Sequence, residues 1–269
     1  MPVASGALRE SLLSGAPALG AWLSFSDALS AETMALTGFD WLLVDMEHGP
    51  IALSDAAAAI TAIRTTPVVP IVRPAWNESS QIQRALDLGC GGVVVPVINS
   101  ADDARSLVRD ARFPPLGERS RGGVRAQYAF GTDAMTYFER ANTELIVLGQ
   151  VETRIAVENV DAIVGVDGLD GVFVGPNDLA ASFGRRWPDC WDRDADYMEA
   201  VQRVASSARD HGKIAGFLAR DAAMARQVVE MGYRFVGVSS DVNYLAGAAK
   251  ASLTATRDAL RQVHRDGVR

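Results

Sequence analysis

The sequence predicts one (β/α)8 barrel, a TIM barrel, over residues 1–269. Short β-rich runs alternate with longer helical stretches eight times in about 250 residues, the arithmetic of this fold. The β-rich runs are continuously apolar, as expected for parallel strands covered by helices. A doubly wound open sheet is the alternative, but the first strand–helix turn, "WLSFSDALS", lacks the GxGxxG pattern of dinucleotide-binding folds.

The expected elements follow from this alternation. Strands are predicted over 18–25, 41–46, 68–73, 91–98, 145–152, 171–175, 214–218 and 235–239. Helices are predicted over 28–37, 54–64, 79–88 with Ser79 as N-cap, 100–111, from Glu152 to about 164, 221–231 and about 242–264, with helical turns after Gly175. Irregular segments at 112–128 and 184–194 interrupt the pattern, and long loops in compact domains are often functional.

Composition excludes several classes of protein. The net charge of -7 does not favour binding to nucleic acid or to an acidic membrane surface. No apolar run reaches the length of a membrane-spanning helix, and the N-terminus lacks the features of a signal peptide. The two cysteines, Cys90 and Cys190, show no CxxC spacing, so a reducing cytoplasm is the simplest setting.

Polar side chains gather after the predicted strands, where barrel enzymes place their active sites. The starts of the strands offer far fewer, with Asp40 and Asp170 the clearest cases. The candidates after the strands are Asp45, Glu47 and His48, Arg73, Gln150 and Glu152, Gly175 to Asp178, and Ser239 to Asp241. Barrel closure would bring these strand ends around one mouth.

Each candidate also has a purely structural interpretation. Asp45 and His48 could cap a turn, and Arg73 could pair with any acidic neighbour. Glu152 and Asp178 could be acids in the first turn of a helix, which the helix dipole favours.

Taken together, the same residues indicate enolate chemistry on a 2-oxo acid. The carboxylates of Glu152 and Asp178 suit a hard divalent cation such as Mg²⁺ or Mn²⁺. The Arg73 guanidinium can bind a carboxylate or stabilise an enolate oxygen. His48, oriented by Asp45, can move a proton near neutral pH.

Four segments carry a resemblance to a known family. They are "GFDWLLVDMEHGP", the stretch from "PIVRPAWN" to "VINSADDA", "GERSRGG", and "GQVETRIAVENVDAIVGVDGLDGVFVGPNDLA". In register from about Gly20 to Asp241, they resemble the HpcH/HpaI aldolases.

The resemblance implies a class II pyruvate aldolase. Such an enzyme joins pyruvate, or a related 2-oxo acid, reversibly to an aldehyde and uses Mg²⁺ or Mn²⁺, with Co²⁺ a further option. By position, the metal ligands would be Glu152 and Asp178, the acid–base pair His48 and Asp45, and the enolate-stabilising residue Arg73. The remaining substrate-binding residues would be Gln150 and the backbone of Gly175, Pro176, Asn177 and Asp178.

The resemblance also implies a homo-oligomer, a hexamer or trimer, in which the last helix packs on a neighbouring subunit. A helix that closes its own barrel is the alternative. Asn177 and the 184–194 loop, both beside the mouth, depart from the family pattern. The resemblance therefore does not say which aldehyde is the acceptor. Arg119, Arg121 and Arg125 could cradle a distal carboxylate or phosphate, or form a solvated loop at a subunit contact.

Two other functions remain open from the sequence. One is a decarboxylase that acts on an oxaloacetate-like acid through the same enolate. The other is a barrel that binds a 2-oxo acid without turning it over.

Overall fold

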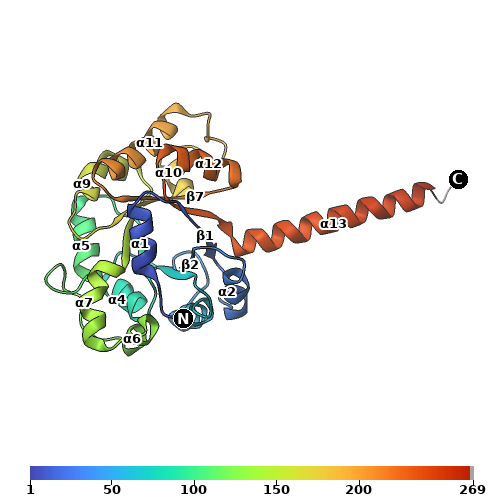
Figure 1. The fold of residues 1–269 in the computed structure, drawn as a ribbon. Helices are drawn as coiled ribbons and strands as arrows, with labels where there is room; N and C mark the ends of the chain where they lie inside the picture. Colours follow the sequence, from blue (N-terminus) through green and yellow to red (C-terminus); the bar gives the residue numbers. More distant parts are fainter. Residues whose placement is uncertain (267–269) are drawn as a thin grey trace.

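Eight parallel strands close into a barrel in the computed structural model, which describes residues 1–266 (Figure 1). Each strand pairs with the next along the chain, and the last pairs with the first. The strands are β1 Ala18–Leu23, β2 Trp41–Asp45, β3 Val69–Arg73, β4 Gly92–Val95, β5 Ile146–Val151, β6 Gly171–Val174, β7 Ile214–Ala219 and β8 Phe235–Ser240. The predicted (β/α)8 fold is confirmed, with strand boundaries that differ from the expected ones by at most three residues.

Helices surround the barrel. They are α1 Ser5–Leu13, α2 Ala28–Ala35, α3 Leu53–Ile63, α4 Ser79–Asp87, α5 Ala101–Ala111, α6 Val124–Phe130, α7 Ala134–Glu144, α8 Arg154–Glu158, α9 Val160–Val164, α10 Pro176–Ser182, α11 Ala195–Asp210, α12 Ala222–Met231 and α13 Asp241–Asp266. The helices α1, α7 and α11 were not predicted, and α6 begins inside the segment expected to be irregular. Ser79 is not the N-cap of α4, because Glu78 occupies that position without a side-chain cap. Within residues 1–266, no helix has the length and apolar character needed to cross a bilayer.

Large side chains fill the interior of the barrel. Trp41 and Phe235 stack with ring centroids 3.9 Å apart, and Phe173 meets Phe235 edge-on. Glycines make this room: a Cβ on Gly20 would lie 2.1 Å from the Trp41 ring, and one on Gly216 would lie 2.4 Å from Phe173. Because the interior is packed rather than hollow, a ligand is confined to the ends of the strands.

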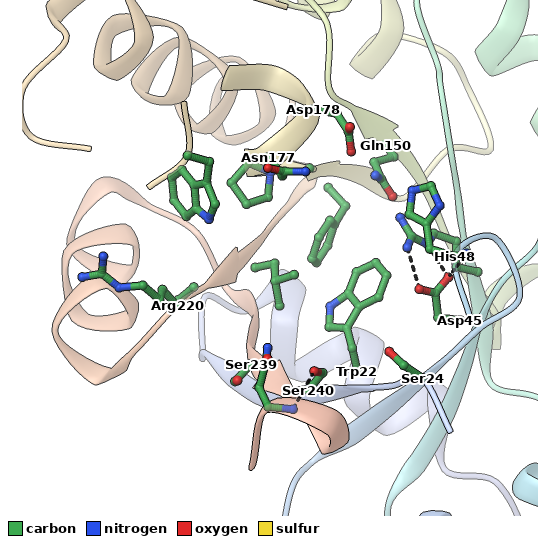
Figure 2. A pocket seen from close by; sticks show the side chains of 18 residues that line it. Trp22, Ser24, Asp45, His48, Gln150, Asn177, Asp178, Arg220, Ser239 and Ser240 are labelled. Carbon is green, nitrogen blue, oxygen red and sulfur yellow. Dashed lines mark hydrogen bonds and ion pairs between the residues drawn. The ribbon is translucent and has the colours of Figure 1, made fainter. Parts of the chain in front are cut away.

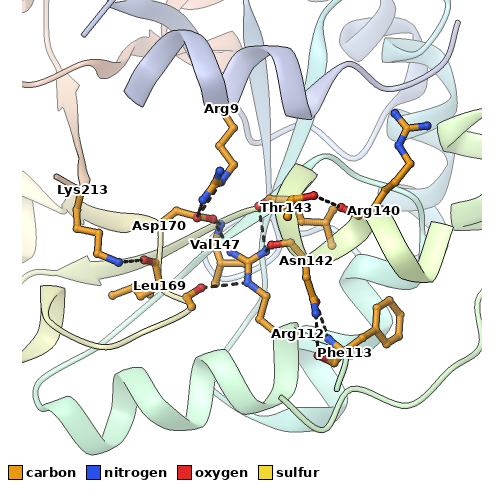
Figure 3. Close-up of polar contacts among 12 residues, drawn as sticks. Arg9, Arg112, Phe113, Arg140, Asn142, Thr143, Val147, Leu169, Asp170 and Lys213 are labelled. Atoms are coloured by element: carbon orange, nitrogen blue, oxygen red, sulfur yellow. Dashed lines mark hydrogen bonds and ion pairs between the residues drawn. The ribbon is translucent and has the colours of Figure 1, made fainter. Parts of the chain in front are cut away.

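A buried ion-pair network closes the N-terminal end of the barrel (Figure 3). Arg112 is 1% exposed, and its Nη2 donates to Asp170 at 2.6 Å. Its Nε and Nη1 donate to the backbone oxygens of Gly168, Asn142 and Leu145. Asp170 also accepts from Arg9 on α1 and from the backbone of Val147. The network joins α1 to the starts of β5 and β6. None of its residues reaches the C-terminal ends of the strands.

Helix α13 projects away from the barrel as a single rod (Figure 1). All residues from 242 to 262 are exposed, so this helix does not cover its own barrel. The large apolar side chains of Leu245, Leu253 and Leu260 lie toward one side of the helix, and each is at least 50% exposed. Helices in proteins owe most of their stability to the packing of an apolar face. The alternative in which the last helix closes its own barrel is therefore wrong.

Candidate active site

A cavity of about 340 Å³ opens at the C-terminal ends of the strands (Figure 2). It is lined by Asp45, His48, Arg73, Gln150 and the segment from Gly175 to Asp178, all predicted from the sequence. The other lining residues are Trp22, Ser24, Phe173, Trp187, Leu218, Ala219, Arg220, Ser239, Ser240 and Asn243. Strand ends that are far apart in the sequence thus meet at one mouth, as the barrel required.

Arg73 is held from three directions at the end of β3. It is paired in register with Asp45 on β2, and its Nε and Nη2 donate to the two Asp45 carboxylate oxygens at 2.9 and 2.7 Å. Its Nη1 lies 2.8 Å from Glu47 Oε2, and the guanidinium lies over the Trp22 ring at 4.2 Å. A guanidinium carries five N–H groups, and the hydrogen bonds to Asp45 use two of them. With Arg73 only 5% exposed, the side chain has little freedom to move.

Asp45 holds the turn that carries His48. Besides the Arg73 guanidinium, Asp45 Oδ1 accepts the backbone N–H groups of Glu47 and His48 at 3.1 and 3.2 Å. The His48 side chain is 63% exposed at the mouth, and its Nε2 lies 3.9 Å from Glu47 Oε2. In this structure Asp45 therefore positions His48 through the backbone, and Glu47 is the carboxylate that faces the imidazole.

Glu152 lies directly behind the wall of the cavity and is 5% exposed. One carboxylate oxygen accepts the backbone N–H of Val97 at 2.7 Å, and the other accepts Gln150 Nε2. Burial raises the pKa of Glu152 to about 7, although these two hydrogen bonds act in the opposite direction. Glu47 and Asp178 also raise this pKa, so the three carboxyl groups are electrostatically coupled.

The Gly175–Asp178 turn forms the opposing wall. A Cβ on Gly175 would lie 2.7 Å from both Gln150 Nε2 and Glu152 Oε2, so this close approach requires glycine. The backbone N–H groups of Asn177 and Asp178 lie in the first turn of α10, where no intrahelical carbonyl can accept them. Pro176 has no N–H, so it can only shape the turn.

Three buried polar atoms of the residues around the cavity lack a hydrogen-bond partner, namely Trp22 Nε1, Glu47 Oε2 and Gln150 Oε1. Gln150 Oε1 accepts nothing, and Glu47 Oε2 meets Arg73 without an aligned hydrogen bond. Burial raises the pKa of Glu47, while the Arg73 guanidinium lowers it. Polar atoms buried without partners are rare in native proteins and mark places where water or an ion binds. Carboxylate oxygens such as those of Glu152 and Asp178 are the ligand type that a hard cation prefers.

The protein would supply only part of the coordination sphere of such a cation. Within the described part of the chain, no group of three or more His, Cys, Asp or Glu side chains is arranged to hold a metal ion. A hard cation at Glu152 and Asp178 would therefore take its remaining ligands from water and from substrate oxygens.

Comparison with known proteins identifies the family. The family model described as HpcH/HpaI aldolase/citrate lyase matches residues 18–248. The chain belongs to this family. The 4-hydroxy-2-oxo-heptane-1,7-dioate aldolase of Escherichia coli is 38% identical to this HpcH/HpaI chain over 243 residues, 90% of this chain and 92% of that enzyme. Membership in the HpcH/HpaI family makes the chain a carbon–carbon lyase.

Solved structures agree with this assignment. An HpcH/HpaI family protein from Burkholderia cenocepacia J2315 is 37% identical, with a TM-score of 0.86 over 94% of this chain and 99% of that chain. Citrate synthase SbnG is 27% identical, with a TM-score of 0.83 over 93% of this chain and 97% of that chain. Proteins similar to this chain in sequence or structure thus carry names for different carbon–carbon bond reactions.

Some residues of the cavity were not assigned a role from the sequence. Ser24 and Arg220 follow β1 and β7, so the rule that active sites lie after strands could have indicated them. Trp187 comes from the 184–194 loop and packs against Trp191 and Phe217. Its position depends on how that loop folds back over the barrel, for which the sequence carries no signal. The prediction that this loop borders the mouth is confirmed.

The arginine-rich 112–128 segment does not line the cavity. Arg119 is buried against the Phe113 ring and pairs with Asp87 at 2.7 Å. Arg125 donates to the backbone oxygens of Leu88 and Ala57. The hypothesis that Arg119 and Arg125 cradle a distal carboxylate or phosphate of a substrate in this cavity is therefore wrong, because these two arginines hold helices together.

Proposed function

We propose that the chain is a class II, divalent-metal-dependent pyruvate aldolase. It would cleave a 4-hydroxy-2-oxo acid reversibly into pyruvate, or a related 2-oxo acid, and an aldehyde. One observation carries the proposal: a rigidly held guanidinium at Arg73 lies in the same cavity as Gln150 and Asp178, with Glu152 directly behind it. The naming of the E. coli relative as an aldolase of this substrate type supports it.

Glu152 and Asp178 would hold the cation, with Mg²⁺ or Mn²⁺ as the expected metals and Co²⁺ as a further option. When bound, a divalent cation polarises the substrate's keto group as a Lewis acid. The raised pKa of Glu152 fits this role, because a cation offsets the cost of burying the carboxylate's charge.

The residues of the chain orient the 2-oxo acid. The free N–H groups of Asn177 and Asp178 suit its carboxylate, because the start of a helix favours an anion. The N–H groups of Arg73 that do not bond Asp45 suit the C2 oxygen, on which negative charge grows as the enolate forms. Since Asp45, Glu47 and Trp22 already fix the guanidinium, little reorganisation is needed during the reaction.

His48 would move the proton. In cleavage, His48 Nε2 accepts the proton of the C4 hydroxyl while the C3–C4 bond breaks, which releases the aldehyde. The electron pair of that bond forms the enolate, and the protonated His48 then returns this proton to C3, directly or through water, which yields pyruvate. The exposed imidazole can exchange this proton with solvent, and Glu47 Oε2 lies 3.9 Å from its Nε2.

Exchange of the pyruvate methyl protons with D2O tests this function directly. The protein is incubated with pyruvate and Mn²⁺ in D2O, the reaction is quenched, and the metal is removed. Proton NMR should then show loss of the methyl signal. With EDTA present during the incubation, the exchange should stop. His48→Ala should slow exchange about 100-fold or more, because general acid–base groups contribute about 10²–10⁴-fold. Absence of metal-dependent exchange would rule out the aldolase. Oxaloacetate decarboxylation far faster than aldol cleavage would instead favour the decarboxylase.

The affinity for metal should depend on pH through Glu152. Its folded pKa is about 7 without metal, so below pH 7 a cation must displace a proton. The apparent Kd for Mn²⁺ should therefore rise about tenfold for each pH unit below 7 and level off above it. Calorimetric titration from pH 5.5 to 8.5 measures this. Glu152→Gln should bind weakly with a flatter profile, and a flat profile in the wild-type protein would contradict the prediction.

We further propose that the enzyme is a homo-oligomer, a hexamer or trimer, in which α13 packs on a neighbouring copy. The uncovered apolar side of α13 supports this, together with exposed apolar residues on the barrel itself. These include Leu19 on β1 and Leu36 after α2, next to a groove formed with Phe39 and Tyr244. A helix of this length with no packing partner would not be stable alone.

Analytical ultracentrifugation tests the assembly. The wild-type protein should sediment well above the 28.7 kDa of one chain. Leu253→Asp should shift the distribution toward smaller species, because it places a charge in an apolar contact. Ala251→Asp is the matched control, since two residues correspond to roughly 200° around the helix. A monomeric wild-type protein, or equal effects of the two variants, would contradict the proposal.

A further inference from the structure

Val97 has an unusual backbone conformation beside the candidate metal ligand. Its φ is +56°, in the left-handed region. This region is costly for a β-branched side chain, and such outliers cluster at functional sites. The residue follows β4 and is partly buried. Neither a turn glycine nor an asparagine is used here, although either would adopt this φ more readily.

The conformation aims two consecutive amides at the end of β5. The N–H of Val97 donates to Glu152 Oε1 at 2.7 Å, and the N–H of Ile98 donates to the Gln150 backbone oxygen at 3.1 Å. The N–H of Val97 thus binds the side chain of the residue after β5, and the N–H of Ile98 binds the backbone of β5 itself. An ordinary extended residue at 97 would turn the following chain in another direction.

The neighbouring residues hold this segment in place. The Ile98 side chain is fully buried and packs closely against Gly149. A Cβ on Gly149 would lie only 3.0 Å from it. The Asn99 backbone oxygen accepts Asn159 Nδ2 at 2.8 Å, and its side chain accepts from the Thr153 hydroxyl. The loop after β4 is therefore anchored to β5 and to the helices that follow it, on both sides of Glu152.

We propose that Val97 is a positioning residue, whose strained backbone aims its N–H at Glu152 Oε1 and so orients this carboxylate for a divalent cation. This inference rests on the proposed metal-dependent function. With Val97 on one oxygen and Gln150 on the other, each oxygen keeps one lone pair for the cation, and the carboxylate cannot rotate. Outer contacts of this kind typically change metal affinity about 10- to 100-fold.

A change of the amide to an ester tests the proposal. Replacing Val97 by 2-hydroxy-3-methylbutanoate substitutes oxygen for the N–H and keeps the side chain. We expect the Kd for Mn²⁺, measured by electron paramagnetic resonance without substrate, to rise about 10- to 100-fold. The matched control is the corresponding ester at Ile98, which removes a bond of the same loop but leaves the Glu152 contact. Val97→Gly, which retains the N–H and tolerates φ +56°, should keep an affinity close to that of the wild type.

The outcomes separate the two levels of inference. Equal Kd values for the Val97 ester and the wild type, or equal weakening by the two esters, would overturn the role of Val97 and leave the metal site standing. A wild-type protein that does not bind Mn²⁺ would overturn the proposed function and this inference with it. A measurement without ester variants is hydrogen–deuterium exchange in Glu152→Ala. Exchange should accelerate at the Val97 amide while Ile98 stays protected, and unchanged protection at Val97 would contradict the proposal.

Discussion

Arg73→Lys should lower kcat for cleavage of a 4-hydroxy-2-oxo acid by about 100- to 1,000-fold, the usual effect of removing one donor that stabilises a developing oxyanion. Lysine keeps the charge but not the planar fork that engages both Asp45 oxygens and still presents N–H groups to the cavity. The loss should fall mainly on kcat, because the charge on the C2 oxygen grows during the reaction.

The measurement is steady-state cleavage together with pyruvate exchange, each at saturating Mn²⁺. Arg226→Lys is the control, since Arg226 pairs with Glu230 on the exposed surface of α12. The affinity for Mn²⁺ should change little in Arg73→Lys, because Arg73 is not a proposed ligand. Exchange at the wild-type rate in Arg73→Lys would remove Arg73 from the mechanism.

Arg112→Met should lower the free energy of unfolding by about 3–5 kcal/mol, as expected when one partner of a buried ion pair is removed. The substitution leaves the backbone oxygens of Gly168 and Leu145 without their donor. It also leaves Asp170 with the Val147 N–H and with Arg9, which is one-quarter exposed, as its remaining partners.

Urea unfolding followed by circular dichroism measures this effect. Arg226→Met is the matched control, because an exposed pair of this kind contributes about 1 kcal/mol or less. The metal-site chemistry should be unchanged in Arg112→Met wherever the protein remains folded, because the network lies at the opposite end of the barrel. A loss similar to that of the control would show that the apolar packing around Arg112 suffices.

The barrel could be predicted from the sequence because strands buried on both faces are unmistakably apolar, and strand number with chain length leaves few alternatives. The location of the site followed from the same rule, since parallel strands in a closed barrel all end on one side. Helix boundaries were harder: α11 was missed although Asp194 accepts the Tyr197 N–H as a good N-cap. The helix begins directly after the irregular Trp-rich 184–194 loop, so its start was not recognised in the sequence.

The pairing of side chains within the site could not be predicted. Asp45 and His48 are close in sequence, which suggested a direct dyad, but the register of β2 and β3 sets Asp45 opposite Arg73. That register depends on the packing of the whole barrel. The contact between Val97 and Glu152 could not be predicted either, because it depends on a backbone conformation that valine rarely adopts.

The exposed rod of α13 has a consequence for how the protein behaves when diluted. Beyond Tyr244, which contacts Phe39 and Val238, the helix is exposed as far as residue 262, so a partner that covered it would have to be another molecule. If that molecule is a second copy, the order of this segment obeys mass action, and the melting temperature rises with protein concentration. A newly synthesised chain would then complete its structure only on meeting another, which couples the amount of enzyme in the cell to the fraction that is fully folded.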